Sequence, residues 1–211
     1  MERIVDIRKE NFTEVHTRAE NVVLDGKPVL RVVKHEKIYE FDENTYAKVK
    51  DLEFHNGIIE VKMLSRLLPD APDFARGFIG IVYRADSADT EFEAFYVRPT
   101  NGRNCPDPVR KSHGCQYFSY PGYTFDYFRE HHITKYEAEA DIDLNEWMTL
   151  KAVIEGNHAE FYLNQDQNPV LVVNDLKHGA DQKGAVGIFV DIGTEAFVSD
   201  FKVICTDGEQ V

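Results

Sequence analysis

The chain has 211 residues, of which 43% are hydrophobic and 29% are charged. This is the balance of a globular protein and excludes extended disorder and a fibrous structure. A length of 211 residues is within the range that one all-β domain fills, so we expect a single domain over residues 1–211. Asp and Glu number 37 against 24 Lys and Arg, a formal net charge of −13. This excess repels phosphate backbones and anionic membrane surfaces, so neither nucleic acid nor a membrane is an expected partner.

The opening segment Met1–Asp6 carries acidic residues and no apolar run of signal-peptide length. No later segment is long and apolar enough to be expected to span a membrane. As written, the chain is expected to be cytoplasmic, or an exported mature form whose signal has been removed. The sequence does not indicate an oligomeric state.

Short β-rich segments of alternating polarity recur along the chain, separated by Gly, Asn, Asp and Pro, whereas helical periodicity is scarce. Their regular spacing leaves no room for long crossover helices, which favours antiparallel pairing. Gly156-Asn157 separates two of them and predicts a tight hairpin turn, because both residues tolerate positive φ. In chain order the expected strands are 22–24, 29–33, 58–64, 78–84, 92–98, 147–155, 158–163, 170–173, 185–190 and 197–204.

One strand and the loop after it differ in character from the rest. In the strand 92–98, alternate residues from Phe92 to Arg98 share one face, so Arg98 continues an aromatic row. The segment 100–114 that follows is long and irregular. Such loops in compact domains are usually functional or disordered, and the composition of this one favours function. It is rich in polar and charged residues, and an aromatic run, 117–128, comes directly after it.

Two groups of residues in the second half of the chain form a recognisable pattern. They are Trp147, Leu150, Lys151, Val153, Gly156, Tyr162, Leu163 and Asn164 in the hairpin, and Gly184, Gly187, Gly193, Thr194, Asp200, Phe201, Lys202 and Val203 near the end. On these residues the segment 56–203 resembles the concanavalin A-like lectin and glucanase superfamily, and within it the laminin G-like and 3-keto-disaccharide hydrolase type domains of unassigned function. The segment 96–103, with His113, Gln116 and Tyr117, resembles a sub-branch found in bacterial proteins.

The resemblance implies an all-β fold, a two-sheet antiparallel jelly-roll sandwich whose concave face and adjoining loops hold a sugar. In this fold pattern Trp147 is expected to anchor the core. Sugar binding needs flat apolar rings beside planar hydrogen-bonding groups, and the segment 96–127 supplies both. The first hypothesis is therefore a carbohydrate-binding groove lined by Arg98, Asn101, Arg103, His113, Gln116 and Tyr117, with Tyr123 as a stacking platform.

A second hypothesis is a glycoside hydrolase or lyase acting on a glycoside or keto-sugar. His113 would be the acid/base, Arg98 or Arg103 would hold a carboxylate or keto oxygen, and Asp107 or Glu195 would assist. Convergence of His113 with an acidic side chain would favour this enzyme, whereas rings without a titratable pair would favour a binding module. A third hypothesis is a protein-interaction domain, which a large exposed apolar patch would support.

Glucanases of this superfamily place paired carboxylates on one strand face. The nearest runs here, 91–93 and 137–141, lack the apolar surroundings that would bury a carboxylate, so both are expected to be solvated. The ordinary glucanase mechanism is therefore not expected.

Three cysteines, Cys105, Cys115 and Cys205, imply no complete disulfide framework. Cys105 and Cys115 could pair across one loop, but reduced thiols are favoured, and Cys115 is expected to be a structural thiol. The spacing of Cys105, His113 and Cys115 matches no zinc pattern, so no metal or cofactor is expected, although the fold leaves room for a structural calcium ion at Asp191 or Asp200.

Overall fold

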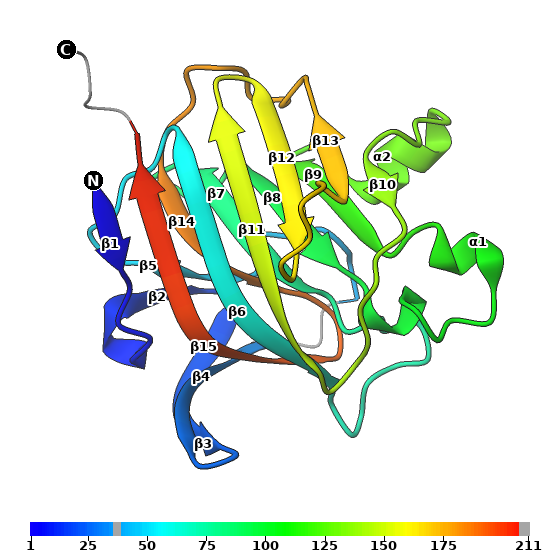
Figure 1. Cartoon of the computed structure of the whole chain (residues 1–211), viewed down its shortest axis with the longest axis horizontal. Coiled ribbons are helices and arrows are strands. Elements are labelled where there is room, and N and C mark those ends of the chain that lie inside the picture. The colour runs from blue at the N-terminus through cyan, green and yellow to red at the C-terminus, as the bar shows by residue number, and fades with distance from the viewer. Residues whose placement is uncertain (36–38, 207–211) are drawn as a thin grey trace.

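The computed structural model describes residues 1–35 and 39–206 and consists of two stacked antiparallel sheets, as predicted (Figure 1). Sheet A has the order β13-β12-β11-β6-β15-β4-β3, with β1 paired to β15, and sheet B has the order β10-β9-β8-β7-β14-β5-β2. The strands of sheet A are β1 (Glu2–Ile4), β3 (Thr17–Leu24), β4 (Lys27–Lys34), β6 (Gly57–Leu67), β11 (Trp147–Glu155), β12 (His158–Leu163), β13 (Leu171–Val173) and β15 (Thr194–Cys205). Those of sheet B are β2 (Phe12–Val15), β5 (Tyr46–Val49), β7 (Ile79–Ala85), β8 (Phe92–Val97), β9 (Cys115–Tyr120), β10 (Glu137–Ala138) and β14 (Ala185–Val190).

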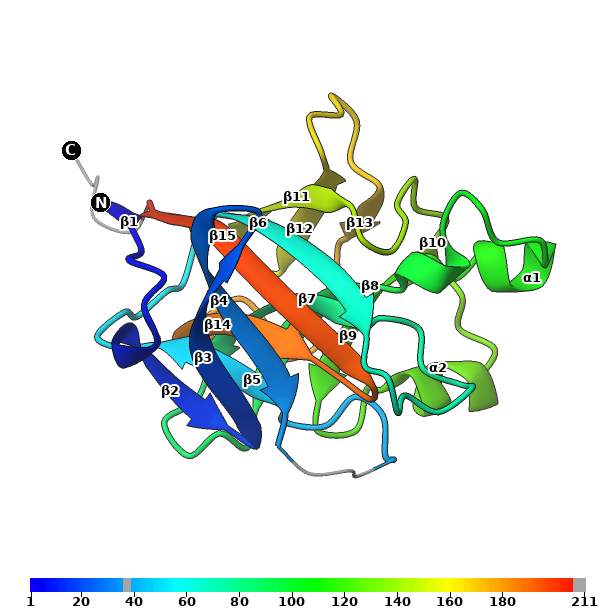
Figure 2. The ribbon, with the colours of Figure 1, turned by 90° about the horizontal axis from the view of Figure 1, so that it is seen from below.

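Helical structure is confined to short segments. Two 3-10 turns, η1 (Lys9–Asn11) and η2 (Pro99–Asn101), accompany two α-helices, α1 (Pro108–Lys111) and α2 (Phe125–Glu130). The two α-helices lie at the same end of the sandwich (Figure 2). Within residues 1–35 and 39–206, no helix is long and apolar enough to cross a membrane.

The core between the sheets follows from the alternation of side chains along the strands. Ile59, Val61 and Met63 of β6 are buried, as their alternation with charged residues predicts. Across the sandwich, Phe95 of β8 stacks on Phe161 of β12 with ring centroids 4.1 Å apart. Phe95 therefore marks the face of sheet B that packs against sheet A.

The opposite face of sheet B carries a layer of aromatic rings. Tyr96 of β8 lies edge-on to Phe118 of β9 at 5.7 Å and close to Phe189 of β14 at 5.4 Å. Phe92, two pleats before Tyr96, contacts the same Phe118 ring. The predicted row from Phe92 to Arg98 is thus confirmed, and Arg98 lies where the row ends.

Some features of the fold differ from the sequence predictions. The strands β1, β2, β5, β9 and β10 were not expected, and in β9 buried residues occupy both faces and hide the alternation. Trp147 was expected to anchor the core, which is wrong. It is half-buried and packs against a small separate cluster of Val29, Leu64 and Phe197, because position 147 of β11 points away from sheet B.

Candidate functional site

Near α1 and α2, the aromatic face of sheet B opens into a cavity of about 260 Å³, here called the basic cavity. Its walls combine aromatic rings with arginine side chains. A larger hollow of about 520 Å³ adjoins Arg103, but no aromatic ring lines it, so it offers no stacking surface. The basic cavity is lined by Phe41, Phe74, Arg76, Phe78, Tyr96, Arg98, Asn101, Val109, Arg110, His113, Phe125 and Arg129.

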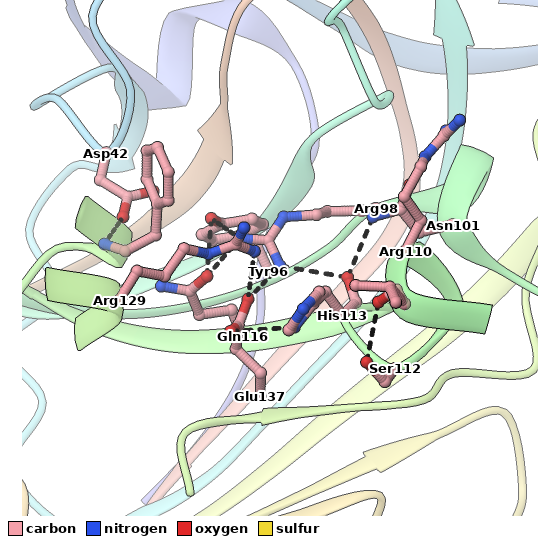
Figure 3. A network of polar contacts seen from close by, with 12 residues as sticks. Asp42, Tyr96, Arg98, Asn101, Arg110, Ser112, His113, Gln116, Arg129 and Glu137 are labelled. Carbon is pink, nitrogen blue, oxygen red and sulfur yellow. Dashed lines mark hydrogen bonds and ion pairs between the residues drawn. The ribbon is translucent and has the colours of Figure 1, made fainter. Parts of the chain in front are cut away.

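Arg98 forms the floor of the basic cavity. Its Nη2 donates to the Tyr96 hydroxyl at 2.7 Å and to Oε1 of Gln116, and its Nη1 donates to Oε1 of Glu137 at 2.8 Å. Only 6% of its side chain is exposed, and 5% of that of Glu137. A buried arginine needs such partners, because an unpaired charge away from water is costly. Figure 3 shows these side chains converging from β8, β9 and β10.

His113 stands beside the same carboxylate. Its Nδ1 lies 3.0 Å from Oε2 of Glu137. Burial lowers the pKa of His113, and the positive charges of Arg129 and Arg98 add to this, so that the adjacent Glu137 offsets the shift only in part. His113 is therefore neutral at pH 7.

The loop 100–114 folds over this floor through α1. The carboxylate of Asp107 caps the helix by accepting from the backbone N–H groups of Val109 at 2.9 Å and Arg110 at 3.3 Å. Arg110 in turn donates to Oδ1 of Asn101, and Asn101 donates to the backbone oxygen of His113 at 3.3 Å. These bonds hold the guanidinium group of Arg110 at the cavity wall.

Aromatic rings close the other side of the basic cavity. Phe41 packs edge-on against Phe74, Phe78 and Phe125 at centroid distances of 5.0–5.7 Å. Arg129 of α2 lies over the ring of Phe125 at 5.5 Å. Phe74 is 40% exposed, so one ring surface at the rim is open to solvent.

Asp42 lies behind this aromatic wall and is buried. Its Oδ2 accepts from the backbone N–H of Phe125 at 2.7 Å, and its own backbone N–H donates to Oδ2 of Asp191 at 3.0 Å. Burial raises the pKa of Asp42 to about 7, against the opposing charge of Arg98. Asp42 thus ties α2 to the aromatic wall.

Four of the predicted ligand-binding residues come together here. Arg98, Asn101 and His113 line the basic cavity, and Gln116 lies beneath Arg98 as its hydrogen-bond acceptor.

The structure does not bring the other three into this group. Tyr117 follows Gln116 in β9, so its side chain points to the opposite face, where its hydroxyl donates to Glu93. Tyr123 packs edge-on against Tyr127 and lies under Lys177. Arg103 pairs with Asp141 and Glu146 outside the basic cavity.

The predicted catalytic assistants are also elsewhere. Asp107 is the helix cap described above, and Glu195 on β15 of sheet A pairs with Arg31 at 2.7 Å. The acidic side chain beside His113 is Glu137.

The expectation that both acidic runs are solvated is wrong for one residue in each. Glu93 is buried between the sheets, where burial raises its pKa, and the side chain of Glu137 is buried beside Arg98. The apolar surroundings that bury these carboxylates come from other strands and loops, not from the neighbouring sequence.

The sequence predictions missed most of the cavity's basic and aromatic groups. Arg76, Arg129 and Phe41 come from segments far apart in the chain, and no local pattern marks them. Arg110 was visible only as one charged residue of the irregular loop. All four lie outside the strands, on α1, on α2 and on the segments before β5 and β7, and meet only in the folded protein.

The residues around Asp191 do not fit the expected calcium ion. Its oxygens accept from Nζ of Lys34 at 2.9 Å and from the backbone N–H groups of Asp42 and Ile192, and the ammonium group would repel a cation. Asp200 is exposed on β15, and calcium there stays a prediction. Among the described residues, no three His, Cys, Asp or Glu side chains gather as metal ligands would.

The three cysteines are all free thiols. Cys115 is buried, and burial raises the pKa of its thiol to about 12, so the reactive thiolate is scarce at neutral pH.

Solved structures with the same architecture connect this fold to known proteins. A carbohydrate-binding module, CBM66, from Bacillus subtilis superposes with a TM-score of 0.61 at 15% identity, over 92% of this chain and 96% of its own. The chain therefore shares the overall fold of this module, a two-sheet antiparallel jelly roll. A second jelly roll of this kind, a Bacillus subtilis protein of unknown function with a galectin-like fold, gives a TM-score of 0.56 at 11% identity, over 92% of this chain and 89% of its own.

A third structure of similar fold, a putative glycosyl hydrolase from Parabacteroides distasonis, gives a TM-score of 0.53 at 16% identity, over 95% of this chain and 92% of its own. No family model and no curated protein matches the sequence. Identities of 11–16% show the fold alone, so the resemblance to laminin G-like and 3-keto-disaccharide hydrolase type domains stays a prediction.

Proposed function

We propose that this protein binds a carbohydrate in the basic cavity. The observation that carries the proposal is the combination of aromatic rings and planar hydrogen-bonding side chains around one hollow of about 260 Å³. Rings such as Phe74 and Phe125 match the C–H faces of a pyranose, and Asn101 and the arginines match its hydroxyl groups. Pockets for drug-sized ligands occupy roughly 300–1,000 Å³, so this cavity suits a single sugar unit. Similar folds among carbohydrate-binding and glycosyl hydrolase structures support the proposal.

The test is saturation-transfer NMR with a panel of methyl glycosides, comparing the protein with its Phe74→Ala variant. Phe74 is partly exposed at the rim, so its removal costs little stability, and we expect affinity for the bound sugar to fall roughly tenfold. Tyr162→Ala is the matched control, because Tyr162 lies on β12 of the other sheet under Lys151. Unchanged binding by the Phe74 variant, or an equal loss in the Tyr162 variant, would contradict the proposed location.

A second candidate function is hydrolysis or elimination of a glycoside, which the contact between His113 and Glu137 favours. A neutral imidazole in the cavity wall can accept a proton, and the Glu137 carboxylate beside Nδ1 can favour the tautomer that carries its proton on Nδ1. New anomeric or unsaturated-sugar signals that disappear in His113→Gln, with binding retained, would establish turnover. Binding without new signals over many hours would leave the binding module as the function.

A further inference from the structure

The charge of the basic cavity is opposite to that of the whole chain. The chain carries a formal charge of −13, yet the described residues that line the cavity include four arginines and one histidine and no Asp or Glu. Glu137 forms ion pairs with two of these arginines, Arg98 and Arg129, and also contacts His113.

Arg76 and Arg110 are the least neutralised of these groups. Nη1 of Arg76 donates to the backbone oxygens of Asp73 and Ala75, and Arg110 donates to the neutral side chains of Asn101 and Thr100. In the described part of the chain, neither forms an ion pair with a carboxylate. Burial and the positive charge of Arg110 lower the pKa of Arg76, which is the mark of like charges held close together.

Arginines outside the cavity form ion pairs with carboxylates of the acidic surface. Arg103 pairs with Asp141 at 2.7 Å and with Glu146, and Arg31 pairs with Glu20 and Glu195. Arg76 and Arg110 are instead fixed by neutral acceptors while their charge stays uncompensated. This is the arrangement that receives an anion, since guanidinium groups bind carboxylate and phosphate oxygens in fork geometry.

We propose that the ligand of the basic cavity is an acidic sugar, a monosaccharide-sized unit carrying a carboxylate or phosphate group that Arg76 and Arg110 bind while its ring packs against the aromatic wall. The inference rests on the proposed carbohydrate-binding function and specifies its ligand class. The rings of Phe74 and Phe125 select for a sugar over a bare anion, and the arginines select for the anion over a neutral sugar.

The experiment compares matched ligands by isothermal titration calorimetry. Methyl β-D-glucuronide is paired with methyl β-D-glucoside, methyl α-D-galacturonide with methyl α-D-galactoside, and glucose 6-phosphate with glucose, while acetate and inorganic phosphate serve as bare anions. We expect at least one acidic sugar to bind roughly tenfold or more tightly than its neutral partner and than the bare anions. The uronide and phosphate arms distinguish the two sources of charge.

Arginine variants locate the site. Arg110→Gln and Arg76→Gln should each weaken binding of the acidic sugar roughly tenfold and weaken the neutral partner by a much smaller factor, because glutamine keeps a hydrogen-bonding group for hydroxyls but no positive charge. Arg103→Gln is the matched control and should bind as the parent does. Both cavity arginines are partly exposed, so their replacement should leave the melting temperature close to that of the parent.

The failures of the two proposals are distinguishable. Equal affinity for neutral and acidic partners would overturn the acidic-sugar proposal and leave carbohydrate binding intact. Acetate or inorganic phosphate binding as tightly as the sugars would overturn it as well, because the rings would contribute nothing. If no sugar in the panel, neutral or acidic, showed detectable binding, both proposals would be overturned.

Discussion

The charge of the buried Asp42 side chain depends on the fold. Its ordinary pKa is 3.8, and burial raises it to about 7 in the folded protein. Because the folded-state pKa is the higher one, the folded protein keeps this proton between about pH 4 and pH 7 while the unfolded chain releases it. The free energy of unfolding therefore falls as the pH rises through that interval.

The isosteric change Asp42→Asn tests this titration. An asparagine tolerates the positive φ of 54° at this position, and its side-chain oxygen can still accept the N–H of Phe125. We expect the variant to gain on the order of 1–3 kcal/mol in free energy of unfolding over the parent when the pH is raised from 4.5 to 8. Urea unfolding at both pH values measures the difference. A variant-to-parent difference that is the same at both values would show that Asp42 does not titrate in this range.

His113 should make binding of the acidic sugar pH-dependent. Burial and the adjacent arginines lower its pKa, so protonation begins below the ordinary value of 6.5 and adds a positive charge to a cavity that also faces Glu137, Arg98 and Arg129. Sugar carboxylates stay ionised down to about pH 5. Affinity for a uronide should therefore rise as the pH falls from 7.5 to 5.5, and calorimetry across this range with the parent and His113→Gln checks it. A rise that persists in His113→Gln would assign the effect to another group.

At the scale of elements, α1 is a helix of four residues, too short to be stable without support. Its support is the Asp107 cap, with Pro108 at the first helical position, and the bond from Arg110 to Asn101. The helix in turn positions Arg110, so losing the cap should also disturb the position of this arginine in the cavity wall.

Asp107→Ala should lower the free energy of unfolding by about 1 kcal/mol and weaken acidic-sugar binding severalfold, because α1 loses its cap. Asp107→Ser keeps a capping oxygen and should restore most of both. Chemical denaturation and calorimetry on the three proteins separate this role from catalysis. If Asp107 were a catalytic acid, the serine variant would be as impaired as the alanine variant.

The elements also explain how far the site could be predicted from the sequence. Arg98 extends a row that alternation identifies, and Asn101 and His113 follow it within one loop, so local pattern was sufficient for them. Tyr117 was misplaced because β9 is buried on both faces. In such a strand the sequence does not indicate which face a given residue occupies. Glu137 meets His113 only because β10 pairs with β9, and no local signal encodes that pairing.

At the scale of the whole molecule, a basic cavity is set in a strongly acidic chain. Fields from exposed charges extend about 10 Å at 0.1 M salt and shrink as salt is added. A small acidic sugar meets the arginines inside the cavity, whereas an acidic polymer must also lie across the surrounding surface. Exposed carboxylates such as Asp126 on α2 and Glu139 after β10 would repel the polymer.

Salt should therefore weaken binding of the small acidic sugar more than binding of an acidic polymer. Raising sodium chloride from 20 to 200 mM should weaken binding of a methyl uronide modestly, because attraction to Arg76 and Arg110 is screened. Binding of an acidic oligosaccharide of six or more units should weaken less or grow stronger, because screening also removes its repulsion by the acidic surface. Calorimetry at both salt concentrations gives the affinity for the oligosaccharide divided by the affinity for the methyl uronide. This ratio should rise with salt. A ratio that falls steeply would instead indicate counterion release along an extended basic track, as for proteins that bind polyanions over their length.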